Sequence, residues 1–170
     1  MATRIKLLKA ARECLLEKGS HAASIKTIAK MANVNHGLVH HYFGSKQGLF
    51  VELLRLHFDT LLLDQPKDFE SDKELNAYVL KKMVPNARLF VEFRALSYQM
   101  PDLAKELAGN LRKLTMMIGA LMGIDDGATR SLVTAAIFGL AMHSSIDPLM
   151  PVSDSLVELH RIFKHRNLVE

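Results

Sequence analysis

The sequence predicts an all-α protein of about nine helices, and three observations support this fold class. Apolar residues recur at spacings of three and four through most of the chain. No stretch shows the alternation of apolar and polar residues that is typical of a half-buried strand. Proline, glycine and short polar runs interrupt the helical segments. Hydrophobic residues make up 49% of the 170 residues and charged residues 24%, which is ordinary for a globular protein with a sizeable core.

Three short helices are expected at the N-terminus, and the first spans residues 4–18. It ends at Gly19, because glycine favours the termination of a helix. The face expected to point inward carries Ile5, Leu8, Ala11 and Leu15. The second helix spans residues 25–32 and begins behind Ser24, whose hydroxyl suits the N-cap position.

A tight turn and a helix with a polar outer face follow. The turn, residues 33–35, reads Asn-Val-Asn, and Asn35 is expected to cap a third helix over residues 36–43. Val39 and Phe43 are four residues apart and are expected to face the first two helices. A helix, a short turn and a second helix with a polar outer face are the parts of a helix-turn-helix DNA reader.

A longer connecting helix is expected over residues 46–63, and its expected inward residues are Leu49, Phe50, Leu53, Leu54 and Leu61. Residues 64–68, which include Pro66, are the expected boundary between two parts of the chain. The five remaining helices are predicted over residues 71–83, 85–99, 101–122, 127–146 and 153–165. The predicted domains are therefore a helix-turn-helix domain over residues 1–45, the connecting helix, and a second helical domain over residues 64–170.

Basic residues are concentrated in the first third of the chain. Residues 1–50 contain eight Lys or Arg and two acidic residues, whereas residues 51–170 contain 14 basic and 16 acidic residues. A basic head on a slightly acidic remainder is typical of a protein whose first part binds a polyanion. An ordinary solvated basic face would give the same counts, so the motif within residues 24–50 decides between the two.

Cysteine content and the first residues indicate a cytoplasmic protein. The single cysteine, Cys14, lies among leucines, so no disulfide forms within the chain, which suits a reducing compartment. The N-terminus lacks the apolar core and cleavage site of a signal peptide. The longest apolar stretches, residues 114–124 and 133–146, are too short and too rich in Gly, Ala and Ser to span a membrane. No membrane partner is expected.

Residues 24–50 read SIKTIAKMANVNHGLVHHYFGSKQGLF and resemble the DNA-binding signature of the TetR/AcrR family of transcriptional regulators. That signature is roughly Thr, an Ile-Ala pair, Ala-Gly-Val-Ser, Gly or Ala, Leu-Tyr, an aromatic-Phe pair, Lys, an acidic residue and Leu. The collinear, gap-free match here consists of Ser24, Ile28-Ala29, Ala32-Asn33-Val34-Asn35, Gly37, Val39-His40, Tyr42-Phe43, Lys46, Gln47 and Leu49. The chain departs from the pattern where His40 replaces tyrosine, Asn35 replaces serine and Gln47 stands at the acidic position.

The resemblance implies that the third helix lies in the major groove of DNA. By the same resemblance, the residues nearest the base edges are His36, Gly37, Leu38 and His41, and the residues nearer the phosphates are His40 and Tyr42. Leu38 either contacts a thymine methyl group or packs within the protein. Because the helix has no Arg or Gln to read a base edge, specificity is expected to depend partly on DNA shape and bound water.

Ser24, Asn35 and Lys46 complete the set of residues expected to contact DNA. Lys46 stands at a helix N-terminus, where a cation is disfavoured by ~0.3–1 kcal/mol, so its presence favours a phosphate bound there by Lys46 and the free backbone N–H groups. Ser24 is a second candidate phosphate ligand, and an ordinary cap or surface lysine is the alternative in each case. Since histidine gains a proton near neutral pH, His40 predicts DNA affinity that rises as the pH falls from about 7.5 to about 6.

Gly37 stands in the first turn of the third helix, although glycine costs ~1 kcal/mol in a helix interior. Close approach of the backbone to DNA is one explanation of this glycine. Close packing against the preceding helix is an equal alternative.

The last two predicted helices carry apolar stripes, and the stripe of residues 127–146 is rich in small residues, which permit close approach of two helices. Two such hairpins can form an intermolecular four-helix bundle, and the resemblance also implies a homodimer. The residues expected at this interface are Leu132, Ala135, Gly139, Met142, Leu156, Leu159 and Phe163. The alternative is that the stripes form the internal core.

Seven of the nine methionines lie between Met83 and Met150, and with nearby aromatic residues they could line an adaptable apolar pocket. The expected lining residues are Phe90, Arg94, Ser97, Tyr98, Met116, Phe138, Met142 and His143. An ordinary helical core with surface polar residues is the alternative. The resemblance implies that a small apolar or amphipathic effector binds there and shifts the connecting helix. Effector binding and dimerisation are therefore both expected of the second helical domain, residues 64–170.

No motif points to catalysis or to a cofactor, because the P-loop, dinucleotide, zinc-protease and serine-hydrolase signatures are all missing. His36 and His40 have the spacing of a metal-binding pair, and His41 and His21 are the candidates for further ligands. No Cys or acidic residue lies between Glu17 and Glu52, so no metal site is expected. The sequence therefore predicts a homodimeric transcriptional repressor that binds a palindromic operator and is released by a small molecule. The alternatives are a helix-turn-helix protein without an effector response and a helical enzyme that processes small molecules.

Overall fold

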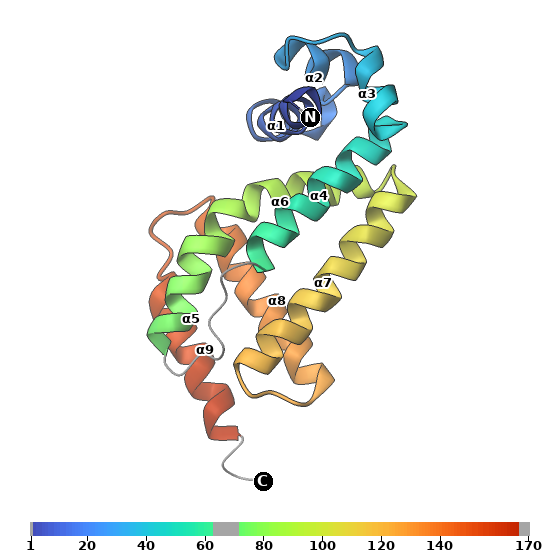
Figure 1. Cartoon of the computed structure of the whole chain (residues 1–170). Coiled ribbons are helices and arrows are strands. Elements are labelled where there is room, and N and C mark those ends of the chain that lie inside the picture. The colour runs from blue at the N-terminus through green and yellow to red at the C-terminus, as the bar shows by residue number, and fades with distance from the viewer. Residues whose placement is uncertain (1, 63–71, 167–170) are drawn as a thin grey trace. The chain divides into compact units, whose positions relative to one another are not determined.

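A computed structural model describes residues 2–62 and 72–166, and every regular element within them is a helix (Figure 1). The α-helices of these residues are α1 (Ala2–Lys18), α2 (Ile25–Met31), α3 (Gly37–Phe43), α4 (Lys46–Leu62), α5 (Asp72–Tyr78), α6 (Ala87–Ser97), α7 (Pro101–Leu121), α8 (Gly127–Ser144) and α9 (Val152–Arg166). Three short turns of other helix types accompany them: η1 (Ser20–Ala22), η2 (Val79–Met83) and η3 (Val84–Asn86). The predicted all-α fold class is confirmed, and the predicted boundary at residues 64–68 lies outside the described residues.

The predicted helix over residues 71–83 is the one whose course differs most from the structure. α5 ends at Tyr78, and the chain continues through the wider π-helical turn η2 and the tighter 3-10 turn η3. Pro85 explains the interruption, because it has no N–H to donate and its ring clashes with the carbonyl four residues earlier in a regular α-helix. Asn86 Nδ2 donates to the Lys82 carbonyl oxygen at 2.7 Å and so satisfies one backbone acceptor of the irregular stretch.

The chain packs as two compact units that are interleaved in sequence. Unit 1 consists of Met1–Leu61 and Arg88–Leu111, and unit 2 of Leu62–Ala87 and Arg112–Glu170. α7 is therefore a single helix whose first half belongs to unit 1 and whose second half belongs to unit 2. Packing assigns residues 88–111 to the same unit as the helix-turn-helix, whereas the sequence-based division assigned them to the second domain.

The core of unit 1 begins with the inward stripe of α1. Fully buried residues of this core include Leu7, Ala11, Cys14, Leu15, Ile28, Val39, Leu49, Phe50 and Leu54. The prediction that Ile5 points inward is wrong, because its side chain is 50% exposed. Since each residue of an α-helix turns by about 100°, Ile5 lies roughly 120° around the helix from Ala11, the centre of the buried stripe.

Unit 2 is built around α8 and α9. α9 packs against both α5 and α8, and the core residues at these contacts include Leu75, Val133, Ile137, Ala141 and Leu156. α8 begins behind Asp126, whose carboxylate accepts from the backbone N–H groups of Ala128 at 3.3 Å and Thr129 at 2.6 Å. Such an N-cap satisfies backbone donors that the helix itself leaves unpaired.

Candidate nucleic-acid interface

The start of α2 has the cap that the sequence predicted, and a backbone hydrogen bond closes the turn after the helix. Ser24 Oγ accepts from the Thr27 backbone N–H at 3.0 Å and also lies 2.8 Å from Thr27 Oγ1. A hydrogen bond from the Val34 N–H to the Ala29 carbonyl oxygen, 3.0 Å long, closes the turn. Asn33 has a φ of 52°, a left-handed conformation that asparagine tolerates better than most residues. These bonds fix the angle at which α3 leaves α2.

α3 is capped by Asn35, as predicted, because Asn35 Oδ1 accepts from the Gly37 backbone N–H at 2.8 Å. His36 has helical backbone angles but no side-chain cap bond, and the regular helix starts one residue later than expected, at Gly37. A Cβ built on Gly37 would meet only the capping oxygen of Asn35, at 3.2 Å. Packing against α2 therefore does not explain this glycine, and the only tight neighbour is the oxygen that caps α3.

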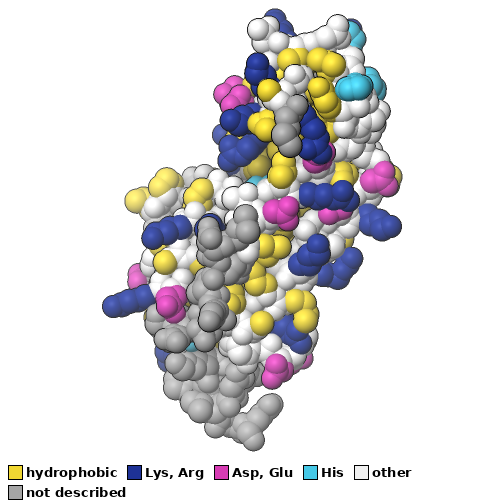
Figure 2. All heavy atoms as spheres, in the orientation of Figure 1, with side chains coloured by type: hydrophobic (Ala, Val, Ile, Leu, Met, Phe, Trp, Pro, Cys, Tyr) yellow, Lys and Arg dark blue, Asp and Glu magenta, His cyan; other side chains and the backbone are white. Residues whose placement is uncertain are grey.

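α3 turns one side chain into the core and most of the others toward solvent. Val39 is completely buried, whereas Phe43 is half-buried beneath the Arg4 guanidinium, whose Cζ lies 5.9 Å from the ring centroid. The exposed residues are Asn35, His36, Gly37, His40 and His41, and the half-buried residues are Leu38 and Tyr42. The predicted DNA-contacting residues of α3 thus share one accessible face. Figure 2 shows histidine side chains gathered on the surface where Figure 1 labels α3.

His40 has its ring orientation set by a backbone carbonyl. His40 Nδ1 lies 3.2 Å from the Gly44 carbonyl oxygen, and because a carbonyl can only accept, Nδ1 carries the hydrogen of this bond. Nε2 is then the ring nitrogen available to a ligand, as an acceptor when the ring is neutral and as a donor when it is protonated. The ring of the neighbouring His41 packs edge-on against Tyr42, with centroids 4.8 Å apart.

α4 begins at Lys46, as predicted. Ser45 Oγ accepts from the Gly48 backbone N–H at 2.9 Å, which makes Ser45 the cap of α4. The next residue, Lys46, is half-exposed, and its Nζ lies 5.9 Å from the centroid of the Phe50 ring. The N-terminus of α4 therefore combines the positive end of a helix dipole with a lysine, an arrangement suited to a phosphate.

Gly48, in the first turn of α4, allows α4 to lie directly against the end of α3. A Cβ built on Gly48 would lie 2.1 Å from the Phe43 carbonyl oxygen, far inside van der Waals contact, so one of the two helices would have to move. The signal for this contact in the sequence is a glycine in the first turns of a long predicted helix. The contact ties the end of the candidate recognition helix to the start of α4.

Three carboxylates of α6 and α7 accept hydrogen bonds from the DNA-binding segment, all within unit 1. Glu92 Oε2 accepts from the Ser20 backbone N–H at 2.6 Å. Asp102 Oδ2, in the first turn of α7, accepts from Gln47 Nε2. Glu106 Oε2, one turn further along α7, accepts from Arg55 Nη2 at 2.7 Å. These bonds join residues more than 50 positions apart, and no sequence pattern predicted them.

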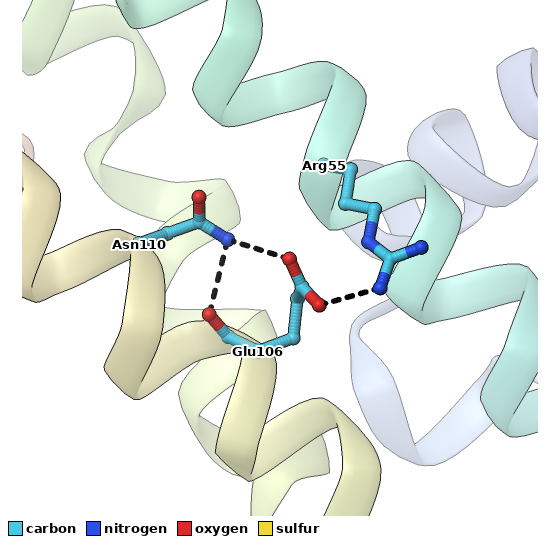
Figure 3. Close-up of polar contacts among 3 residues, drawn as sticks. All are labelled: Arg55, Glu106 and Asn110. Carbon is cyan, nitrogen blue, oxygen red and sulfur yellow. Dashed lines mark hydrogen bonds and ion pairs between the residues drawn. The ribbon is translucent and has the colours of Figure 1, made fainter.

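Glu106 also has a second partner on its own helix (Figure 3). Asn110 Nδ2 donates to the Glu106 carbonyl oxygen at 3.0 Å and to Glu106 Oε1 at 3.2 Å. Asn110 is buried, with 5% of its surface exposed. The hydrogen bond and charge of Glu106 raise the pKa of Arg55 above its ordinary value, so Arg55 stays charged.

α4 also contributes a buried histidine that no motif pointed to. His57 is 8% exposed, and its ring centroid lies 5.8 Å from that of Phe58 and 5.8 Å from that of Phe93 on α6. Burial, and to a lesser extent the charge of Arg12, lowers the pKa of His57 from 6.5 to about 4. The imidazole is therefore neutral near pH 7, as a core residue between α4 and α6.

The predicted effector-pocket residues divide evenly between the two units, with Phe90, Arg94, Ser97 and Tyr98 in unit 1 and Met116, Phe138, Met142 and His143 in unit 2. Within unit 1, Arg94 Nη1 donates to Ser97 Oγ at 3.3 Å, and its Cζ lies 4.2 Å from the centroid of the Tyr98 ring. Tyr98 is 75% exposed and Met116 is 59% exposed. These two side chains are thus on the surface of their units.

The predicted dimer residues also differ in burial. Leu132 is 59% exposed, and Ala135, on the same face of α8, is exposed as well. Gly139, Met142 and Leu159 are half-buried. Leu156 and Phe163, at 1% and 7% exposure, are core residues of the protomer. Their assignment to an interface is therefore corrected, because a side chain packed inside one protomer has no surface left for a second.

Within residues 2–62 and 72–166, no three or more His, Cys, Asp or Glu side chains are arranged to hold a metal ion. No helix of the same residues is long and apolar enough to cross a membrane.

The helix-turn-helix segment matches known bacterial proteins. Residues 7–53 match the family model described as bacterial regulatory proteins of the tetR family. Over 49 residues the chain is 47% identical to the HTH-type transcriptional regulator BetI of Vibrio campbellii, which covers 29% of this chain and 25% of that protein. The matched segment thus spans about a quarter of the length of such curated relatives.

The fold as a whole matches solved regulators. A transcriptional regulator from Rhodococcus sp. Rha1 superposes with a TM-score of 0.80 at 22% identity, over 94% of both chains. The multidrug binding protein EbrR, solved in complex with imidazole, superposes with a TM-score of 0.73 at 20% identity, over 93% of both chains. At these identities the likeness concerns the fold. BetI and the Rhodococcus protein are both described as transcriptional regulators.

Proposed function

We propose that this chain, whose residues 7–53 match the model of the TetR family of bacterial regulatory proteins, is a transcriptional repressor of that family that binds a palindromic operator as a homodimer. One observation carries the proposal. α3 is anchored by the buried Val39 and turns His36, Gly37, His40 and His41 to solvent on a single face. An exposed, polar, short helix at the end of a helix-turn-helix is the geometry that enters a major groove.

The electrostatics around α3 favour a polyanion. The first 50 residues contain eight Lys or Arg against two acidic residues, and both acids, Glu13 and Glu17, lie on α1. Ser45, which caps α4, and Lys46 lie two and three residues beyond the end of α3. We assign Lys46, Ser24, Asn35, His40 and Tyr42 to the phosphates. The base edges are assigned to the exposed α3 residues His36, Gly37, Leu38 and His41.

A homodimer follows from the size of the reading surface. α3 has seven residues, and one helix of that length reads few base pairs, whereas a two-fold dimer reads two half-sites about one DNA turn, or ~34–36 Å, apart. Leu132 and Ala135 give α8 an exposed apolar face that a second protomer can cover. Gly139, Met142 and Leu159 complete the proposed interface.

A small apolar or amphipathic effector is proposed to release the protein from DNA. EbrR, which shares the fold, is described as a multidrug binding protein, and the methionine-rich region between Met83 and Met150 offers adaptable apolar side chains. Such an effector acts only if it binds the DNA-free conformation more tightly than the DNA-bound one.

The test is selection of bound duplexes from a random DNA pool by the full chain, followed by affinity measurements at two salt concentrations. The proposal predicts enrichment of one palindrome and an affinity that falls steeply as salt rises. Recovery of unenriched DNA by folded protein would contradict it.

A helix-turn-helix protein without an effector response is the second candidate, and it predicts the same DNA selection. A screen of small molecules separates the two. In the proposed function, a compound that raises the melting temperature also weakens operator binding. In the second candidate, no compound changes either quantity.

A further inference from the structure

α7 holds α4 through two polar contacts on the surface of unit 1. Gln47, in the first turn of α4, donates to Asp102 on α7. Arg55, two turns further along α4, donates to Glu106 on α7 at 2.7 Å. The two acceptors are four residues apart and therefore lie on one face of α7. Neither contact belongs to the DNA-contacting set or to the proposed effector and dimer residues.

Glu106 is the better held of the two acceptors. Its Oε1 accepts from the buried Asn110 while its Oε2 accepts from Arg55 (Figure 3). Exposed ion pairs contribute little when both long side chains must first be ordered. Because Asn110 already orders the Glu106 carboxylate, the pair with Arg55 avoids part of that cost. Glu106 is thus a fixed point on α7 rather than a freely moving surface acid.

The position of α4 is transmitted to α3 through the junction between them. Gly48 lies so close to the Phe43 carbonyl oxygen that a Cβ there would be 2.1 Å away. Ser45 caps α4 one residue after Gly44, where α3 has ended. A shift of the first turns of α4 therefore moves the C-terminal end of α3 with it.

We infer that Glu106 is a positioning residue for DNA binding. Through Arg55 it holds α4, and through α4 it holds the recognition helix α3 in the register that binds DNA. The inference rests on the proposed function and adds the residue of α7 that acts on α3. Both residues of the pair and the recognition helix belong to unit 1.

The experiment compares Arg55→Glu, Glu106→Arg and the double variant Arg55→Glu/Glu106→Arg in the full chain, using the selected duplex as the probe. Each single variant sets two like charges against each other and is expected to weaken DNA binding by roughly two- to thirty-fold. The double variant restores an opposite pair with the wild-type net charge, and it is expected to recover most of the affinity. The salt slope stays that of the wild type throughout, because no phosphate contact is lost.

The single variants change net charge, and matched controls remove that effect. Glu106→Arg makes the protein more positive, which by itself favours DNA, so a loss of affinity runs against the charge change. Asp59→Arg makes the same charge change on an exposed position of α4. Lys105→Glu matches Arg55→Glu on an exposed position of α7 beside Glu106. The inference requires each single variant to bind more weakly than its control.

If a charge reversal at 55 or 106 prevents folding, which thermal melting detects, Glu106→Gln tests the inference instead, because it removes the charge that holds Arg55 and keeps a polar side chain beside Asn110. Glu106→Gln is expected to weaken DNA binding, and wild-type affinity in this variant would overturn the inference. A second pair of variants tests the neighbouring contact between α4 and α7. Gln47→Glu replaces the donor to Asp102 with a carboxylate, so the carboxylates at positions 47 and 102 repel each other. Addition of Asp102→Lys then supplies an attractive partner. The same order of affinities is expected, with Gln47→Glu weak and the double variant restored.

The outcomes separate this inference from the proposed function. Salt-dependent wild-type binding, together with weak single variants and restored double variants, supports both. Wild-type binding with folded single variants that match their controls, or with double variants as weak as the singles, overturns the inference alone. A wild type without salt-dependent binding overturns the proposed function and this inference with it.

Discussion

His57 predicts a measurable loss of stability in mild acid. The imidazole is 8% exposed and packed between Phe58 and Phe93, and its pKa is lowered from 6.5 to about 4 by burial, with a smaller effect of Arg12. In the unfolded chain the ring is in water and titrates near its ordinary value of about 6.5. Between these two values the unfolded state binds more protons than the folded state, so the free energy of unfolding falls as the pH falls.

The magnitude follows from the two pKa values. The stabilisation from a neutral buried His57 is complete above about pH 6.5 and is lost progressively down to about pH 4. From pH 8 to pH 5 the loss from this one group is about 2 kcal/mol. That is a large fraction of the stability of an ordinary domain, which is on the order of 5–15 kcal/mol.

Urea unfolding at pH 8 and pH 5 measures the effect. His57→Leu keeps the site apolar and removes the titrating group, so its free energy of unfolding is expected to fall by about 2 kcal/mol less than that of the wild type between the two pH values. His143→Leu, at an exposed histidine, is the matched control and keeps the wild-type pH dependence. An identical pH dependence in the His57→Leu and His143→Leu variants would refute the reasoning.

Further predictions concern the DNA-binding residues. Gly48→Ala introduces a Cβ 2.1 Å from the Phe43 carbonyl oxygen. It should therefore lower the free energy of unfolding by about 1–3 kcal/mol and weaken DNA binding. An unchanged melting temperature would count against the tight α3–α4 junction. Gly37→Ala meets only a cap oxygen, so it should weaken DNA binding while stability stays close to wild type. Lys46→Ala should weaken binding to every duplex and lower the salt slope by about one, whereas His36→Ala should change sequence preference in a repeated selection.

Local signals predicted the DNA-binding segment well. Ser24 and Asn35 were expected as caps because short polar side chains bond nearby backbone N–H groups, and both do so. Val39 was expected inside from its spacing to Phe43, and it is fully buried. Each of these features depends on residues within four positions of one another, which is the range over which sequence patterns carry structural information.

Contacts between distant residues were beyond that range. Nothing in the local pattern pairs Arg55 with Glu106, because that pair depends on which helix packs opposite. The spacing of the inward residues of α4 places residue 57 on the buried face, but the partner ring of Phe93 depends on tertiary packing. Apolar spacing also did not separate an interface from a core. Leu132 and Leu156 both stand on apolar stripes, yet the first is exposed and the second is buried.

Recognition of two half-sites by two copies of α3 is the central claim, and the most direct measurement uses the selected duplex and a variant of it with one half-site scrambled. Stoichiometry and affinity would be determined for both duplexes at two salt concentrations. The account predicts two protomers on the intact duplex, a loss of affinity of at least ~10³-fold when one half-site is scrambled, and a steep salt dependence in each case. One protomer per duplex with equal affinity for both sequences would contradict it.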